Sequence, residues 1–283
     1  MGQLAEALLH GVADPLLHSK YGPAFEMIIK REYVKEDGFS RLDVLVSSLV
    51  SSRWRERVNN GSRITDIIAS IKVALADEGD PSEQAIACAM SMQAAFSLRS
   101  NAENDENRQA LSELTTILKP FLRDPRPCFH GGAAWAYAWL GEREAVTASV
   151  GHAVMSRLFE LWYGSQDHEV RRMAAWAFSA LPILDRGSVT LPQPDEALIS
   201  WLIERSNAES VHSASYYAPL VLAYYWRRPW SDREIGERVA VVSETPHTSV
   251  TNSGLRLLNA LGPAGAEFMP KNEERQRTPS RRM

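Results

Sequence analysis

The chain carries the segment Val170-Arg-Arg-Met-Ala-Ala-Trp-Ala-Phe178 and repeats versions of it at regular intervals. The version Phe129-His-Gly-Gly-Ala-Ala-Trp-Ala-Tyr137 starts 41 residues earlier, and Val211-His-Ser-Ala-Ser-Tyr-Tyr-Ala-Pro219 starts 41 residues later. A fourth version, Val250–Leu258, starts 39 residues after Val211. A shorter version, Ile86–Met90, starts 43 residues before Phe129. Self-similarity at a period of about 40 residues indicates a stack of one repeated supersecondary unit.

Each version has the pattern of an amphipathic helix. In the clearest one, apolar residues recur at i, i+4, i+7, i+8 and i+11 from Val170 to Leu181, and a helix places such residues on one face. Asp167 stands where its side chain can cap the first turn. Further amphipathic segments lie between the versions, and prolines mark the joints. This alternation predicts antiparallel helix pairs, and no segment shows a convincing β alternation.

One version carries a more specific order of residues. Asp167 is followed by Val170-Arg171, then by Ala-Ala-x-Ala, and finally by Leu181. This order resembles the inner helix of a HEAT repeat, in particular the variety shared with phycobilin-lyase-like proteins. The later and earlier versions keep the apolar pattern but lose the acidic residue and the arginine.

The resemblance implies an all-α fold, a right-handed α-solenoid of about five to six stacked antiparallel helix pairs. This HEAT/armadillo-like solenoid is expected to cover roughly residues 24–265. Residues 1–23 are expected to form an N-terminal capping segment, because the end repeats of solenoids are commonly atypical. Residues 266–283 are expected to form a disordered basic tail.

Composition and charge exclude several classes of protein. Hydrophobic residues make up 45% of the 283 positions, enough for a sizeable core. The formal net charge is −4, and the segment from Lys271 onward carries five basic and two acidic residues, so the remainder is more acidic still. Such a charge supplies no general attraction to nucleic acid or to an anionic membrane. The N-terminus lacks a signal-peptide pattern, and no apolar run reaches membrane-spanning length.

No catalytic, cofactor-binding or metal-binding motif stands out. Phosphate-binding glycine loops, nucleophile elbows and zinc-binding helix motifs are lacking. His168-Glu169 resembles the His-Glu pairs of some HEAT-like di-iron hydroxylases, but the equivalent positions hold Pro127-Cys128 and Glu209-Ser210. A single pair cannot fill a metal coordination sphere, so we interpret it as a helix start. Cys88 and Cys128 lack metal-ligand spacing, which indicates free thiols in a reducing cytoplasm.

The predicted partner-binding surface lies near the C-terminus, where aromatic residues are densest. Tyr217 and Tyr224 can serve the core of one helix, and neighbouring rings then point elsewhere. Aromatic residues with adjacent arginines supply much of the energy of protein interfaces. The residues of this aromatic cluster are Tyr216, Tyr217, Tyr224, Tyr225, Trp226, Arg227 and Trp230.

Two columns of equivalent repeat positions provide further candidates. One column follows the first residue of each version, forms a weakly basic stripe suited to an acidic partner, and consists of His130, Arg171 and His212. The other contains Trp135, Trp176 and Tyr217, which either pack between adjacent repeats or protrude as a binding ridge. We expect packing, with the Trp176 ring buried between repeats.

These observations predict a non-catalytic scaffold, adaptor or sensor whose partner is another protein. A solenoid offers a long concave surface without a catalytic pocket. Two alternatives stay open: a HEAT-like DNA-alkylation-repair glycosylase or other nucleic-acid-binding solenoid, and a chromophore-lyase-like protein, which the repeat subtype alone suggests. The negative charge argues against nucleic acid. We expect no cofactor, no metal, no small-molecule substrate, no membrane contact and a cytoplasmic location.

Overall fold

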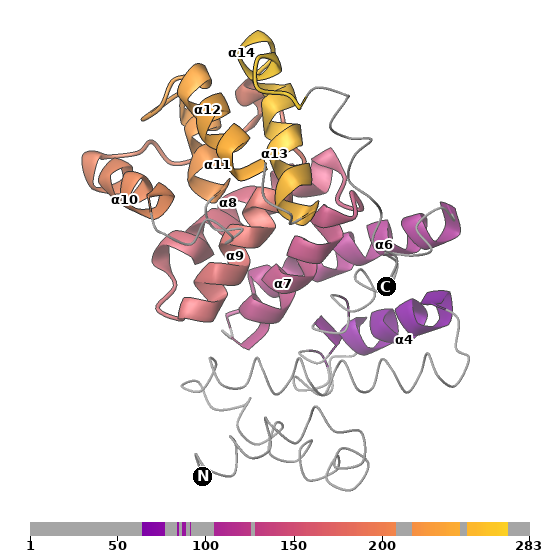
Figure 1. Cartoon of the computed structure of the whole chain (residues 1–283). Coiled ribbons are helices and arrows are strands. Elements are labelled where there is room, and N and C mark those ends of the chain that lie inside the picture. Colours follow the sequence, from indigo (N-terminus) through magenta and orange to yellow (C-terminus); the bar gives the residue numbers. More distant parts are fainter. Residues whose placement is uncertain are drawn as a thin grey trace, which may run out of the picture. The chain divides into compact units, whose positions relative to one another are not determined.

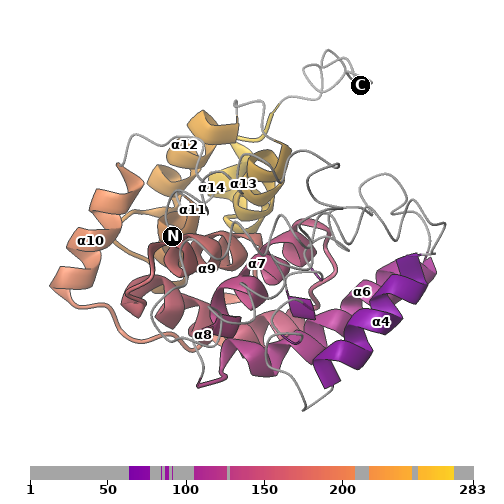
Figure 2. The same cartoon turned by 90° about the horizontal axis from the view of Figure 1, so that it is seen from below.

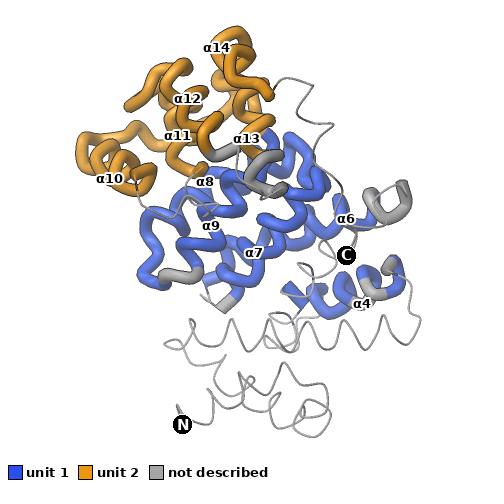
Figure 3. The backbone as a smooth tube through the Cα atoms, viewed as in Figure 1, with its two compact units in different colours: residues 1–182 blue, residues 183–283 orange. Residues whose placement is uncertain are grey.

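Every regular element in the described residues is a helix (Figure 1). A computed structural model provides the structure, and it describes residues 64–76, 84, 87, 88, 91, 105–125, 128–207, 217–243 and 248–270. The predicted all-α class is therefore confirmed for these residues. The chain divides into two compact units, unit 1 over residues 1–182 and unit 2 over residues 183–283 (Figure 3). None of the helices in the described ranges is both long enough and apolar enough to cross a membrane.

Several predicted features fall outside the described residues. They are the capping segment 1–23, residues 211–216 of the third repeat version, and residues 271–283 of the expected tail. The first residues of that tail are described: α14 spans Pro263–Ala266 and a turn continues to Pro270. In this turn the Phe268 ring lies against α12, where a methyl group added to Gly236 would approach it to 2.6 Å.

Unit 1 contains the two clearest repeat versions as separate helices. The versions that start at Phe129 and Val170 lie in α7 (Cys128–Glu142) and α9 (His168–Ala180), and α8 (Ala148–Gly164) connects them. The predicted cap of α9 is confirmed, because the Asp167 carboxylate accepts from the Val170 backbone N–H at 3.3 Å. The other helices that the structure describes in this unit are α4 (Ile64–Ala76), α6 (Asp105–Leu118) and the 3-10 helix η2 (Lys119–Leu122).

The helices α7 and α9 lie side by side and run in the same direction (Figures 1 and 2). Trp139 contacts Trp176, and Gly141, two residues further along α7, lies against Ala180, four residues further along α9. Because residues later in α7 contact residues later in α9, the two helices are parallel. Small side chains permit this approach: buried alanines fill much of both helices, and a methyl group on Gly141 would lie 2.6 Å from the Ala180 carbonyl oxygen.

The C-terminus of α7 ends in a Schellman motif. The Ala145 N–H donates to the Leu140 carbonyl at 2.9 Å, and the Glu144 N–H donates to the Gly141 carbonyl at 2.9 Å. The motif needs one residue in the left-handed region, and Glu144 supplies it with φ of 55°. Glycine is preferred there because it has no Cβ to clash with the following carbonyl.

We therefore expect Glu144→Gly to raise the free energy of unfolding by about 1 kcal/mol. The Glu144 side chain is exposed, so little packing is lost. Chemical denaturation of the variant and the parent chain measures the difference. Glu144→Ala keeps the Cβ and serves as the control, with little expected gain. Equal gains for both variants would contradict the backbone explanation.

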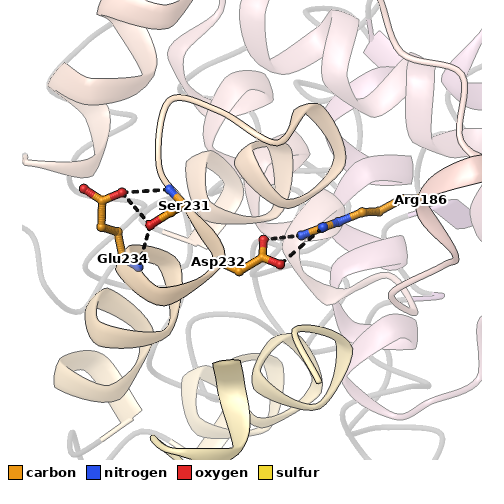
Figure 4. Close-up of polar contacts among 4 residues, drawn as sticks. All are labelled: Arg186, Ser231, Asp232 and Glu234. Carbon is orange, nitrogen blue, oxygen red and sulfur yellow. Dashed lines mark hydrogen bonds and ion pairs between the residues drawn. The ribbon is translucent and has the colours of Figure 1, made fainter. Parts of the chain in front are cut away.

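The described residues of unit 2 form six helical elements, and local sequence signals start several of them. The predicted capping box of α12 is confirmed: Glu234 accepts from the Ser231 N–H at 2.7 Å, and the Ser231 hydroxyl accepts from the Glu234 N–H at 3.3 Å (Figure 4). The Asp195 carboxylate caps α10 by accepting from the Leu198 N–H at 2.8 Å. Besides α14, the elements are η3 (Arg186–Ser188), α10 (Glu196–Ser206), α11 (Tyr217–Trp226), α12 (Asp232–Ser243) and α13 (Thr248–Ala260).

Candidate functional site

The aromatic cluster predicted near the C-terminus is largely inside unit 2. Tyr217, Tyr224 and Trp230 have exposed fractions of only 1%, 6% and 7%. The expected core role of Tyr217 and Tyr224 is therefore confirmed. Tyr225 and Trp226 are half-buried, and Arg227 is exposed. Tyr216 lies outside the described residues, as does His212 of the basic column.

Two side chains of this cluster, Tyr224 and Tyr225, contact the segment before α10. The Arg186 guanidinium pairs with both carboxylate oxygens of Asp232, at 2.6 and 3.4 Å (Figure 4). The same guanidinium lies 4.1 Å from the centre of the Tyr224 ring. The Tyr225 hydroxyl accepts from the Leu184 N–H at 3.0 Å. Burial raises the pKa of Tyr225 to about 12. These contacts assign a structural role to the cluster, and its binding of a partner stays a prediction.

The two described members of the basic column occupy different environments. The His130 ring donates from Nε2 to the Asp124 carbonyl at 2.8 Å, and burial lowers the pKa of His130. This side chain is therefore less often cationic near neutral pH than an exposed histidine. Arg171 is half-buried, and its guanidinium forms no ion pair with another described residue. Of the two described residues of this column, only Arg171 is therefore expected to be fully charged at neutral pH.

Three tryptophans lie on α7 and α9 in the described part of unit 1. Trp135, Trp139 and Trp176 are all half-buried. The rings of Trp139 and Trp176 meet edge to face with centroids 5.2 Å apart. Trp176 also donates from Nε1 to the Glu142 carboxylate at 3.0 Å. Trp176 therefore packs against the preceding repeat version, as expected, but the residue is half-buried and not fully buried.

The geometry of α7 explains why tryptophans mark this face. Trp135, Trp139 and Glu142 stand at i, i+4 and i+7, so they share one stripe of the helix. The other residues from 131 to 141 are buried. On α9, exposed Arg172 and half-buried Trp176 stand at i and i+4 and continue the surface. We call this set the tryptophan surface; its residues are Trp135, Trp139, Glu142, Arg143, Arg172 and Trp176.

Four of the six residues of this surface, Trp139, Glu142, Arg143 and Arg172, were not singled out by the repeat comparison. Trp139 has Ala180 as its equivalent one repeat later, so the repeat column does not mark it. The i, i+4 spacing of Trp135 and Trp139 is the signal that identifies it. Arg143 was equally unmarked, although its guanidinium lies 5.8 Å from the centre of the Trp139 ring.

The tryptophan surface combines tryptophan and arginine side chains. Tryptophan and arginine are the residues most enriched among energetic hot spots of protein interfaces. No three His, Cys, Asp or Glu side chains among the described residues are grouped so that they can hold a metal ion. No family model matches the sequence, and a search of curated proteins found no match.

Proposed function

We propose that this chain is a non-catalytic, cytoplasmic protein-binding module built as a HEAT-like α-solenoid, and that it binds a partner protein through the tryptophan surface. The proposal rests on three half-buried tryptophans that lie on two neighbouring helices. A half-buried tryptophan is held in place by its packing within the protein, so its exposed part is already ordered before a partner binds. Little side-chain entropy is lost when a partner covers such a ring.

The order α7, α8, α9 supports the solenoid part of the proposal. Two equivalent helices run in the same direction and touch, and the helix between them packs against the second. Stacked helix pairs bring equivalent helices together in this manner. The nucleic-acid alternative is less well supported, since the chain carries a net charge of −4.

The surface offers enough apolar area to matter for affinity. Covering a further roughly 50 Å² on each of three rings is worth about 4 kcal/mol at about 25 cal/mol per Å². Part of this gain is offset by the loss of translational and rotational freedom on association. The tryptophans can therefore anchor an interface, and polar contacts around them are needed to complete it.

The experiment places a photo-crosslinking residue at the exposed position 172 in the full chain. In extract from the native cells we expect one crosslinked protein partner at this position, identified by mass spectrometry. Trp135→Ala with Trp139→Ala is expected to weaken the crosslink about tenfold, because the anchoring rings are removed.

Trp201→Ala is the matched control, since Trp201 is also half-buried and has an arginine, Arg205, 5.7 Å from its ring centre. Circular dichroism establishes that each variant is folded. An equal loss of the crosslink with Trp201→Ala, or an undiminished crosslink in the double variant, would refute the proposed surface.

A further inference from the structure

None of the three indole N–H groups of the tryptophan surface is open to a partner. A tryptophan side chain has a single polar atom, the Nε1 nitrogen that carries this N–H. Nε1 is buried in both Trp135 and Trp139, although each residue is only half-buried. In Trp176, Nε1 donates its hydrogen to the Glu142 carboxylate at 3.0 Å. The parts of the Trp135 and Trp139 side chains that reach solvent therefore consist of carbon atoms.

The Trp176 ring is held in place by two residues of α7. Trp139 and Glu142 stand at i and i+3 on this helix, so they share a face of it. Trp139 contacts Trp176 through its ring, and Glu142 contacts it through the carboxylate. A hydrogen bond to a carboxylate is stronger than one to a neutral acceptor. A partner that accepted from the Trp176 N–H would have to displace this carboxylate, so Trp176 offers its ring.

The atoms at the rings also select the polarity of the occupant. A carboxylate, amide or hydroxyl that covered these carbon atoms would lose water without gaining a hydrogen bond from an indole. A cation gains from an open aromatic face. However, the Arg143 guanidinium lies 5.8 Å from the centre of the Trp139 ring and repels a second positive charge. An apolar side chain carries neither cost and gains from burial.

We propose that the partner protein covers the tryptophan rings with an uncharged, apolar side chain, and that no hydrogen bond joins the partner to an indole N–H. This inference rests on the proposed function and specifies the partner's chemistry at the rings. A protein segment fits them better than stacked nucleotide bases, because the net charge of −4 opposes the phosphates that accompany bases.

The first test removes the N–H of Trp135 and keeps the shape of its ring. In Trp135→benzothienylalanine a sulfur atom replaces the indole N–H. This N–H has no hydrogen-bond partner among the described residues, so the change leaves no described acceptor unpaired. The probes are peptides selected from a random library on the full chain that bind Trp135→Ala with Trp139→Ala at least about tenfold more weakly. We expect the benzothienylalanine variant to bind them within about twofold of the parent chain, by fluorescence anisotropy.

The second test changes the selected peptides. We expect each to contain one aliphatic side chain whose change to glutamine or lysine weakens binding about tenfold. Trp201→Ala is the matched control and is expected to bind the peptides as the parent chain does, since Trp201 is half-buried on α10.

Four outcomes would each overturn the inference. They are a benzothienylalanine variant that binds as weakly as Trp135→Ala, selected peptides that depend on a carboxylate or an ammonium group at the rings, a preference for a single-stranded oligonucleotide, and the absence of any such peptide. The crosslink at position 172 judges the proposed function separately. A protein crosslink that is lost in the double variant supports that function even when the peptides contradict an apolar contact.

Discussion

Gly141→Ala is expected to lower the free energy of unfolding by about 2–3 kcal/mol. The added methyl carbon would lie 2.6 Å from the carbonyl oxygen of Ala180, 2.9 Å from its carbonyl carbon and 3.0 Å from its Cβ. Two of these are backbone atoms of a neighbouring helix, which cannot rotate away as a side chain can. The helices must separate, and this cost exceeds the gain of about 1 kcal/mol that alanine has over glycine in a helix.

Gly164→Ala provides the control within the same unit. A methyl group on Gly164, the last residue of α8, meets nothing within 4 Å. It is expected to leave stability unchanged or to raise it by up to about 1 kcal/mol. Urea denaturation followed by circular dichroism measures both variants. If Gly141→Ala proves as harmless as Gly164→Ala, the close packing of α7 on α9 is not as described.

Tyr217→Ala is expected to lower the free energy of unfolding by about 3–5 kcal/mol, the range for deletion of a large buried aromatic side chain. Tyr217 is 1% exposed, and every residue of α11 from Tyr217 to Tyr224 is buried. The ring therefore has no surface to offer a partner. Tyr217→Phe keeps the packing and is expected to cost at most about 1.5 kcal/mol.

Arg227→Ala is the control for Tyr217→Ala, because Arg227 belongs to the same aromatic cluster but is exposed. Its expected effect lies within about 0.5 kcal/mol. Thermal or urea denaturation distinguishes the two, and the crosslinking experiment at position 172 shows any effect on binding. A Tyr217→Ala variant that stays as stable as the parent but loses the partner would restore Tyr217 as a binding residue.

Features that depend on neighbours in the sequence were predicted well. The helices α7, α8 and α9 lie where the repeat placed them. Asp167 and the Ser231–Glu234 pair cap helices as expected. Such features follow from the helical period of apolar residues and from hydrogen bonds that span three or four residues. Both act within one or two turns, so the order of residues suffices to determine them.

Features that depend on distant segments were predicted less well. The dense aromatic cluster suggested an exposed surface, but Tyr224 instead supports Arg186, 38 residues earlier in the chain, and that arginine pairs with Asp232. Trp139 became part of a surface because Trp176 lies beside it. The helical pattern of a sequence predicts which residues share a face of the helix, but it does not predict which other segment covers that face.

The sequence by itself determined the helices, their caps and the register in which equivalent positions recur, since these arise from local geometry and a repeated pattern. Only the tertiary structure decided which aromatic rings are buried and which remain at the surface. Burial depends on the approach of a neighbouring helix, as at Gly141 and Ala180, and on side chains brought in from distant parts of the chain. For that reason the candidate binding surface lies on α7 and α9, where the tryptophans are packed against one another without being fully covered.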